Sequence, residues 1–163
     1  MTGSRRPGGA HDFDFLRGSW RVVNRRLRSR LAGSDDWELF EAYMDNSPVL
    51  GGLGNIDRYR ATRGEMDFEG FLLRVFDPRT ERWSIYWADN VGCELGPPVV
   101  GGFVAGVCEL FGDDRHEGRD VLVRARYSSI TRDSVRWEQA FSEDGGETWE
   151  TNWIMEFTRK QPS

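Results

Sequence analysis

From Trp20 to the C-terminus, the chain consists of short segments that favour β-strands, with turn residues between them. Segments such as RWSIYWAD are rich in aromatic and β-branched residues, which pack well on a pleated surface. Pairs such as Asp77-Pro78 mark the turns, and nothing after Gly18 keeps a helical period. The pattern predicts an all-β domain of roughly nine or ten strands, since a spacing of about 8–12 residues is typical of a barrel or sandwich.

We expect these strands to form a single up-and-down antiparallel β-barrel of roughly eight to ten strands, because closure removes the exposed edges of the sheet. The length of 163 residues fits one domain. The barrel domain is predicted to span residues 11–160 and to begin with a short helical turn in HDFDFLRG. Residues 1–10 carry almost no apolar side chain and are predicted to be a disordered arm.

The composition limits which partners and cofactors are expected to bind this chain. The net charge of −5 provides no general attraction for nucleic acid or an anionic membrane. No apolar run approaches the ~18 residues of a membrane span, and the N-terminus lacks the apolar stretch of a signal peptide, so we expect a cytoplasmic protein. Cys93 and Cys108 are expected to be free, buried thiols. No metal and no cofactor is expected, because His11 and His116 do not lie on a strand with a second ligand.

The stretch SEDGGETW, residues 142–149, reads S-x-D-x-G-x-T-W. This spacing resembles the Asp-box, a hairpin motif of sialidases and other β-propellers. A single hairpin in a short chain without internal repeats cannot supply the blades of a propeller. We therefore interpret the motif as structural: Asp144 accepts hydrogen bonds from turn amides, and Trp149 folds over the turn.

Gly18-Ser19-Trp20 opens the first strand, and Arg159 lies near the end of the last. This G-x-W with a late cation resembles the calycin superfamily, which includes lipocalins and fatty-acid-binding proteins. The resemblance implies that Trp20 plugs the closed end of a barrel and that Arg159 stacks across it, an arrangement in which a guanidinium gains cation–π attraction.

A second resemblance extends from Phe13 to Arg159. FDFLRGSW, PVLGGLGN and FDPRTERWSIYWAD are similar to segments of an actinobacterial family annotated only as a domain of unknown function. That resemblance implies a lipocalin-like barrel and, by itself, no reaction.

Three segments combine aromatic with polar residues on one strand face and so predict a ligand cavity. RWSIYWAD places Trp87 and Asp89 on one face and Tyr86 on the other, and RWEQAF places Trp137 with Gln139. The last segment, WETNWIMEF, is expected to place Trp149, Thr151, Trp153, Met155 and Phe157 on one face. Ordinary core packing is the more common role of such tryptophans. The residues predicted to bind a ligand are Glu41, Tyr43, Arg74, Trp87, Trp137, Gln139, Trp153 and Met155.

Glu41 and Tyr43 are assigned to the cavity because they share an apolar strand face with Trp37 and Leu39. An acid on such a face is costly unless it is paired. The expected partner of Glu41 is an arginine such as Arg74 or Arg26.

The sequence leaves three functions open. The first is a small-molecule binding protein that holds a largely apolar ligand. The second is a cofactor-independent cyclase, isomerase or dehydratase acting on a polyketide- or terpene-like substrate, with Glu41 or Asp89 as acid and Tyr86 or Tyr43 as hydrogen-bond donor. The third is a ligand-free structural or dimerisation module. The expected partner is a small hydrophobic molecule, and a homodimer is left open.

Overall fold

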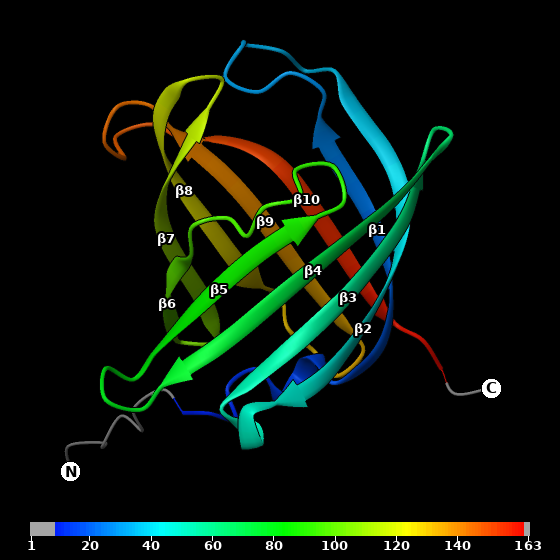
Figure 1. Ribbon diagram of the computed structural model, residues 1–163, viewed down its shortest axis with the longest axis vertical. Coiled ribbons are helices and arrows are strands. Elements are labelled where there is room, and N and C mark those ends of the chain that lie inside the picture. Colours follow the sequence, from blue (N-terminus) through cyan, green and yellow to red (C-terminus); the bar gives the residue numbers. More distant parts are fainter. Residues whose placement is uncertain (1–8, 162–163) are drawn as a thin grey trace.

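A computed structural model describes residues 9–161, and in it ten antiparallel strands close into one barrel (Figure 1). Each strand pairs with the next along the chain, and the last pairs with the first. The strands are β1 (Gly18–Leu27), β2 (Trp37–Val49), β3 (Gly54–Arg63), β4 (Met66–Asp77), β5 (Arg82–Asp89), β6 (Val99–Val104), β7 (Val107–His116), β8 (Arg119–Ser128), β9 (Ser134–Ser142) and β10 (Glu150–Arg159). The predicted up-and-down barrel is confirmed.

Two short 3-10 helices complete the described chain, η1 (Asp14–Leu16) and η2 (Leu50–Gly52). Residues 1–8 of the predicted arm lie outside the described residues. Gly9 already takes part in a turn, where its amide donates to the Asp12 carboxylate at 2.8 Å, and Ala10 packs against the core. No helix within residues 9–161 is long and apolar enough to cross a membrane.

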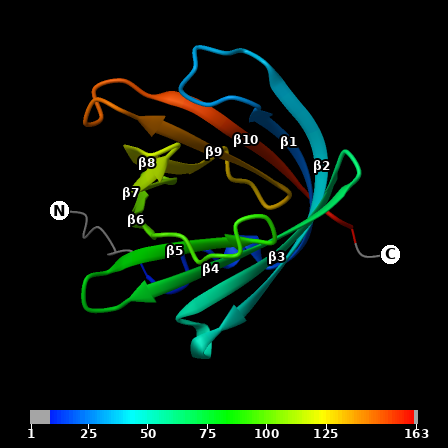
Figure 2. The ribbon, with the colours of Figure 1, turned by 45° about the horizontal axis from the view of Figure 1, so that its top comes forward.

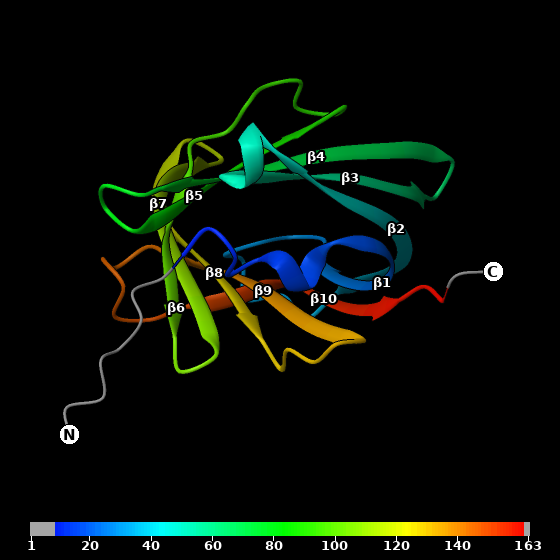
Figure 3. The same cartoon turned by 90° about the horizontal axis from the view of Figure 1, so that it is seen from below.

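The two ends of the barrel differ. Helix η1 lies across the end at which β1 begins and β10 finishes, as the view from below shows (Figure 3); we call this the closed end. The connections β1–β2, β3–β4, β5–β6, β7–β8 and β9–β10 gather at the opposite end, the open end (Figure 1). There the β5–β6 connection curves inward over the ring of strands (Figure 2).

Along β1, buried side chains that face the barrel interior alternate with exposed side chains that face the solvent. Trp20, Val22 and Asn24 are fully buried, whereas Arg21 and Arg25 are exposed. Successive side chains of a strand point to opposite faces, so a period of two separates the core from the solvent. The inner face nevertheless carries polar residues, and these define the cavity described below.

Trp20 and Arg159 meet at the closed end. The Trp20 indole is fully buried and donates to the Leu16 carbonyl at 2.8 Å, and the Arg159 guanidinium lies 4.2 Å from the centre of its ring. Arg159 also donates to the carbonyls of Phe15, at 2.7 Å, and Arg17, at 2.6 Å. Arg159 of the last strand therefore contacts both Trp20, which fills the closed end, and the turn that precedes the first strand.

Gly18 permits this arrangement. Its φ of +105° lies in a region that disfavours other residues, and a Cβ there would approach the Arg159 guanidinium to 3.1 Å. Gly18 therefore allows the chain to pass from η1 into β1 beneath the arginine.

The Asp144 carboxylate organises the hairpin between β9 and β10. It accepts hydrogen bonds from the Thr148 amide at 2.9 Å, from the Thr148 hydroxyl and from the Ser142 hydroxyl. These bonds, with those of Thr148 the strongest, lower the pKa of Asp144 from its ordinary value of 3.8 to about 2. The Trp149 indole donates to the Gly146 carbonyl at 3.0 Å and lies over the turn.

Trp149 does not share a face with Trp153, and this sequence prediction is wrong. Trp149 lies on the outside, 4.7 Å below the Arg124 guanidinium. The register of β10 against β9 shifts between Thr151 and Trp153, and such a bulge breaks the alternation of a strand. As a result Asn152 and Trp153 are both buried, although they are neighbours in sequence.

Trp20→Ala should lower the free energy of unfolding by about 3–5 kcal/mol, as expected for a large buried aromatic residue. Arg159→Ala should cost less, and the double variant should cost less than the sum, with a coupling of about 1 kcal/mol. Urea denaturation of the four proteins measures the coupling. The Arg124–Trp149 pair on the outer surface is the control, and a coupling no larger than its value would contradict a closing role.

Asp144→Asn should lower the melting temperature at neutral pH, because the carboxylate is held ionised by hydrogen bonds. The depressed pKa stabilises the fold above pH 3.8, and this contribution is lost as the pH falls through about 2. The difference in melting temperature from the wild type should therefore shrink between pH 4 and pH 2. Asp35→Asn, at an exposed acid, serves as the control, and a difference that does not change with pH would refute the assignment.

Candidate ligand cavity

A cavity of about 170 Å³ lies inside the barrel. Most of its lining is apolar or aromatic and comes from strands on opposite sides of the ring, including Leu72, Trp87, Ala125 and Trp153. Gly96, Pro97, Asp113 and Asp114 line it near the open end. The cavity is therefore an internal space whose mouth lies beneath the β5–β6 connection.

Three tryptophans form an aromatic wall. The ring of Trp153 meets Trp87 at 5.9 Å and Trp137 at 5.6 Å, and both contacts are edge-to-face, the arrangement that aromatic quadrupoles favour. Trp87 requires a glycine at position 70 of the neighbouring strand β4, because a Cβ there would lie 2.2 Å from its ring. The indole of Trp87 also donates to Asp89 at 2.8 Å. The wall is thus held by packing and by a fixed hydrogen bond.

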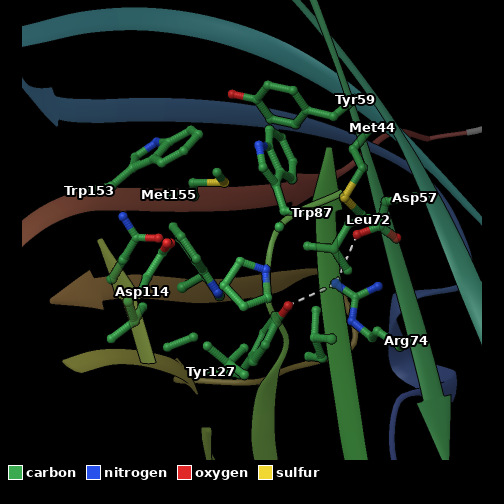
Figure 4. A pocket seen from close by; sticks show the side chains of 18 of the residues that line it. Met44, Asp57, Tyr59, Leu72, Arg74, Trp87, Asp114, Tyr127, Trp153 and Met155 are labelled. Atoms are coloured by element: carbon green, nitrogen blue, oxygen red, sulfur yellow. Dashed lines mark hydrogen bonds and ion pairs between the residues drawn. The ribbon is translucent and has the colours of Figure 1, made fainter. Parts of the chain in front are cut away.

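A buried ion pair joins the neighbouring strands β4 and β3 beside the cavity (Figure 4). Arg74, which is 1% exposed, donates to Asp57, Asn55 and the Tyr127 hydroxyl oxygen, each at 2.8 Å. Asn46 donates to Asp57 at 2.6 Å. Burial alone lowers the pKa of Arg74, but the Asp57 carboxylate and Tyr127 outweigh it, and the net shift is upward. Arg74 therefore remains a cation in the interior, where Asp57 and its other hydrogen-bond partners offset the cost of its burial.

Tyr127 offers a hydrogen-bond donor to the cavity. Its oxygen accepts from Arg74 and makes no other hydrogen bond to a protein group within residues 9–161. Burial raises the pKa of Tyr127 to about 12, so the hydroxyl keeps its proton at neutral pH. Tyr127 lines the cavity, and its O–H can donate to an acceptor placed there.

Two buried asparagines support the remaining polar groups. Asn24 accepts from the Tyr59 hydroxyl at 2.7 Å and from the Trp153 indole at 3.0 Å. Asn152 accepts from the Gln139 side chain at 2.9 Å. The donors of Tyr59 and Trp153 are therefore already occupied, unlike that of Tyr127.

The structure brings together six of the residues predicted to bind a ligand. Arg74, Trp87, Trp137, Gln139, Trp153 and Met155 all line the cavity. Sequence reasoning missed Asp57, Tyr59 and Tyr127, which also line it. Asp57 and Tyr59 alternate with arginines in NIDRYRAT, and that period of two was the signal that could have placed them inside.

Glu41 and Tyr43 lie outside the barrel, so their assignment to the cavity is wrong. Glu41 is exposed and pairs with Arg21 across the outer face of β1 and β2, not with Arg74 or Arg26. Tyr43 is 48% exposed. The buried face of β2 instead carries Ala42 and Met44; both faces of this strand contain apolar residues, and the face with the acid is the one that faces water.

Tyr86 and Asp89 do not line the cavity either. Tyr86 lies on the outer face of β5, between the inward-facing Ile85 and Trp87. Burial raises the pKa of Asp89, but hydrogen bonds from the Gly92 amide and from Trp87 outweigh it, and the net shift is downward. Asp89 is therefore a carboxylate at neutral pH and not a proton donor.

The two cysteines are free thiols with different surroundings. Cys93 is exposed, contrary to prediction, because it lies in the β5–β6 connection. Cys108 is buried, and burial raises its pKa to about 12. A protonated thiol is a poor nucleophile, so Cys108 adds no reactive group to the interior.

Comparison with known proteins identifies the fold. No family model matches the chain, and no curated protein matches it. Among solved structures, the S-type phycobiliprotein lyase of Guillardia theta is similar over 93% of this chain and 92% of its own, with a TM-score of 0.63 and 13% identity. A redesigned β-barrel is similar over 97% of this chain and 100% of its own, with a TM-score of 0.52 and 10% identity. These similarities and the strand order show the fold, a closed up-and-down antiparallel β-barrel.

Arg74→Met should lower the free energy of unfolding by about 3–5 kcal/mol, because it leaves the Asp57 carboxylate buried without its cation. The double variant Arg74→Met/Asp57→Leu should recover part of this loss, since it removes the stranded charge as well. Chemical denaturation of the wild type and the three variants measures both effects. A double variant that loses the full sum of the two single effects would contradict the view that the charges act as a pair.

Proposed function

We propose that the protein binds a small, largely apolar molecule that carries one hydrogen-bond acceptor, such as a carbonyl oxygen. The observation that carries the proposal is the O–H of Tyr127, which faces an aromatic cavity without a protein acceptor among the described residues. Binding sites of this kind combine an apolar lining with a few placed polar groups. In the bound state the acceptor of the ligand would lie against Tyr127 and its rings against the tryptophan wall.

The size of the cavity sets the size of the ligand. Its volume of about 170 Å³ is close to that of an engineered cavity of about 150 Å³ that holds benzene and below the roughly 300–1,000 Å³ of most ligand pockets. We therefore expect a ligand of one or two rings. A larger molecule would require the β5–β6 connection to move away from the mouth, where Gly96 and Pro97 lie against the cavity.

The structural neighbour supports binding only in general terms. It is named as a phycobiliprotein lyase, and at 13% identity its activity does not transfer to this chain. The resemblance to an actinobacterial family of unknown function adds no ligand. The cofactor-independent enzyme considered above is not proposed, because Glu41, Tyr43, Tyr86 and Asp89 all lie outside the cavity lining.

An uncharged two-ring dye with one ketone oxygen, 6-propionyl-2-(dimethylamino)naphthalene, tests the proposal. It should bind with a blue shift in its emission and should quench the tryptophan fluorescence of the protein. Tyr127→Phe should weaken binding by about 3- to 10-fold, the equivalent of one neutral hydrogen bond. Tyr43→Phe, on the outer surface, is the matched control.

Ala125→Phe should abolish dye binding without loss of stability, because the new ring fills the space that the dye would occupy. Ala88→Phe on the outward side of β5 is the control, and thermal melts establish that each variant is folded. The proposal fails if the dye does not bind, or if it binds Ala125→Phe as well as it binds the wild type.

A further inference from the structure

Three arginines gather at the open end of the barrel. Arg26 is the last inward-facing residue of β1, Arg30 lies in the β1–β2 connection, and Arg63 ends β3. Arg63 has an acid partner, since it donates to Glu38 at 2.6 Å. For Arg26 and Arg30, no carboxylate within residues 9–161 comes within 4.0 Å of the guanidinium, and the buried Nε of Arg26 makes no hydrogen bond.

Aromatic rings hold both unpaired cations beside the cavity. The guanidinium of Arg26 lies 4.8 Å from the ring centre of Trp153, which lines the cavity. That of Arg30 lies 5.6 Å from the ring of Phe141, two residues along β9 from Gln139 in the lining. Neither arginine is part of the lining itself, but Arg26 contacts a ring that lines the cavity, and Arg30 contacts a ring on the strand that carries Gln139.

The nearby acids are already engaged. Glu38 binds Arg63, Glu150 accepts the Leu31 amide at 2.7 Å, and Asp89 accepts the Trp87 indole. Glu117 and Asp114 also act on Arg30, but only through longer-range attraction. No protein carboxylate of the described chain thus neutralises Arg26 or Arg30 directly.

Repulsion between the arginines makes the charged forms of Arg26 and Arg30 less favourable. The pKa of Arg26 is lowered to about 10, first by burial and then by the charges of Arg30 and Arg63, which outweigh the opposite effect of Glu38 and Asp89. Burial and the charge of Arg63 lower the pKa of Arg30 as well. Both side chains are still cations at neutral pH, and an anion placed between them would offset burial and repulsion together.

We propose that Arg26 and Arg30 bind a carboxylate that the molecule in the cavity carries in addition to the acceptor placed at Tyr127. The proposal rests on the proposed function and narrows the ligand to an aromatic or otherwise apolar acid. A guanidinium matches a carboxylate with two parallel hydrogen bonds, and Arg26 has an unused Nε–H for that purpose. Asp113 and Asp114, which also line the cavity near its mouth, would repel an acid and direct it toward β1.

The test compares two compounds that differ only in charge, 2-naphthylacetate and 2-naphthylacetamide, by isothermal titration calorimetry. The wild type should bind the acid more tightly, and added salt should narrow the gap. Arg26→Met and Arg30→Met should each weaken binding of the acid by about tenfold or more while changing binding of the amide less than twofold. Arg25→Met is the matched control, since Arg25 stacks on Trp37 outside the barrel at 5.2 Å.

Thermal melts of the unliganded variants separate binding from structure. Arg26→Met should melt no lower than the wild type, because the substitution removes a half-buried cation that has no acid partner. Equal binding of the acid and the amide by the wild type would overturn the carboxylate site and leave the proposed function standing. An equal loss of acid binding in Arg25→Met and Arg26→Met would also overturn it, as it would indicate general surface charge. Failure of both compounds and of the uncharged dye would overturn the proposed function too.

Discussion

Closure of the sheet between β1 and β10 is the constraint on which the rest of the structure depends. Seven consecutive residue pairs join the two strands, from Trp20 opposite Arg159 to Arg26 opposite Trp153. Without this seam the sheet would have two open edges and no enclosed interior. The same two strands also place a cation over a tryptophan at each end of the barrel. At the closed end, Arg159 of β10 lies over Trp20 of β1. At the open end, Arg26 of β1 lies over Trp153 of β10.

The interior of the barrel is unusual in holding charge. Arg74 and Asp57 are almost fully buried, and desolvating two ions is costly unless each finds partners. Asn46, Asn55 and Tyr127 supply those partners from three further positions around the wall. Because the network occupies one side of the cavity and the tryptophans occupy another, the remaining space has both a polar and an apolar face. Because of this asymmetry, we expect a ligand to bind in one orientation, with its acceptor at Tyr127.

The similarity to solved barrels at 13% and 10% identity illustrates which features the fold requires. A closed antiparallel barrel needs alternating strands, turns that connect neighbours, and small residues where the walls approach closely. Gly70, beneath Trp87, meets the last requirement here. The lining of the cavity is not among those requirements, so the proposed binding depends on particular side chains such as Tyr127 and not on the barrel itself.

The sequence by itself determined the strands, the turns between them and the closed antiparallel barrel, because strand propensity and turn chemistry are local and closure follows from the number of edges to be removed. The hairpin around Asp144 is equally local. Only the tertiary structure decided which face of β2 is inside, since Glu41 and Met44 lie on opposite faces that both carry apolar residues. It alone placed Asn152 beside Trp153 in the interior, through a bulge with no sequence signature. It also brought Arg74 together with Asp57 and Tyr127, which are 17 and 53 residues away in sequence. Such pairs depend on the register of all the strands in the barrel, which no single segment encodes.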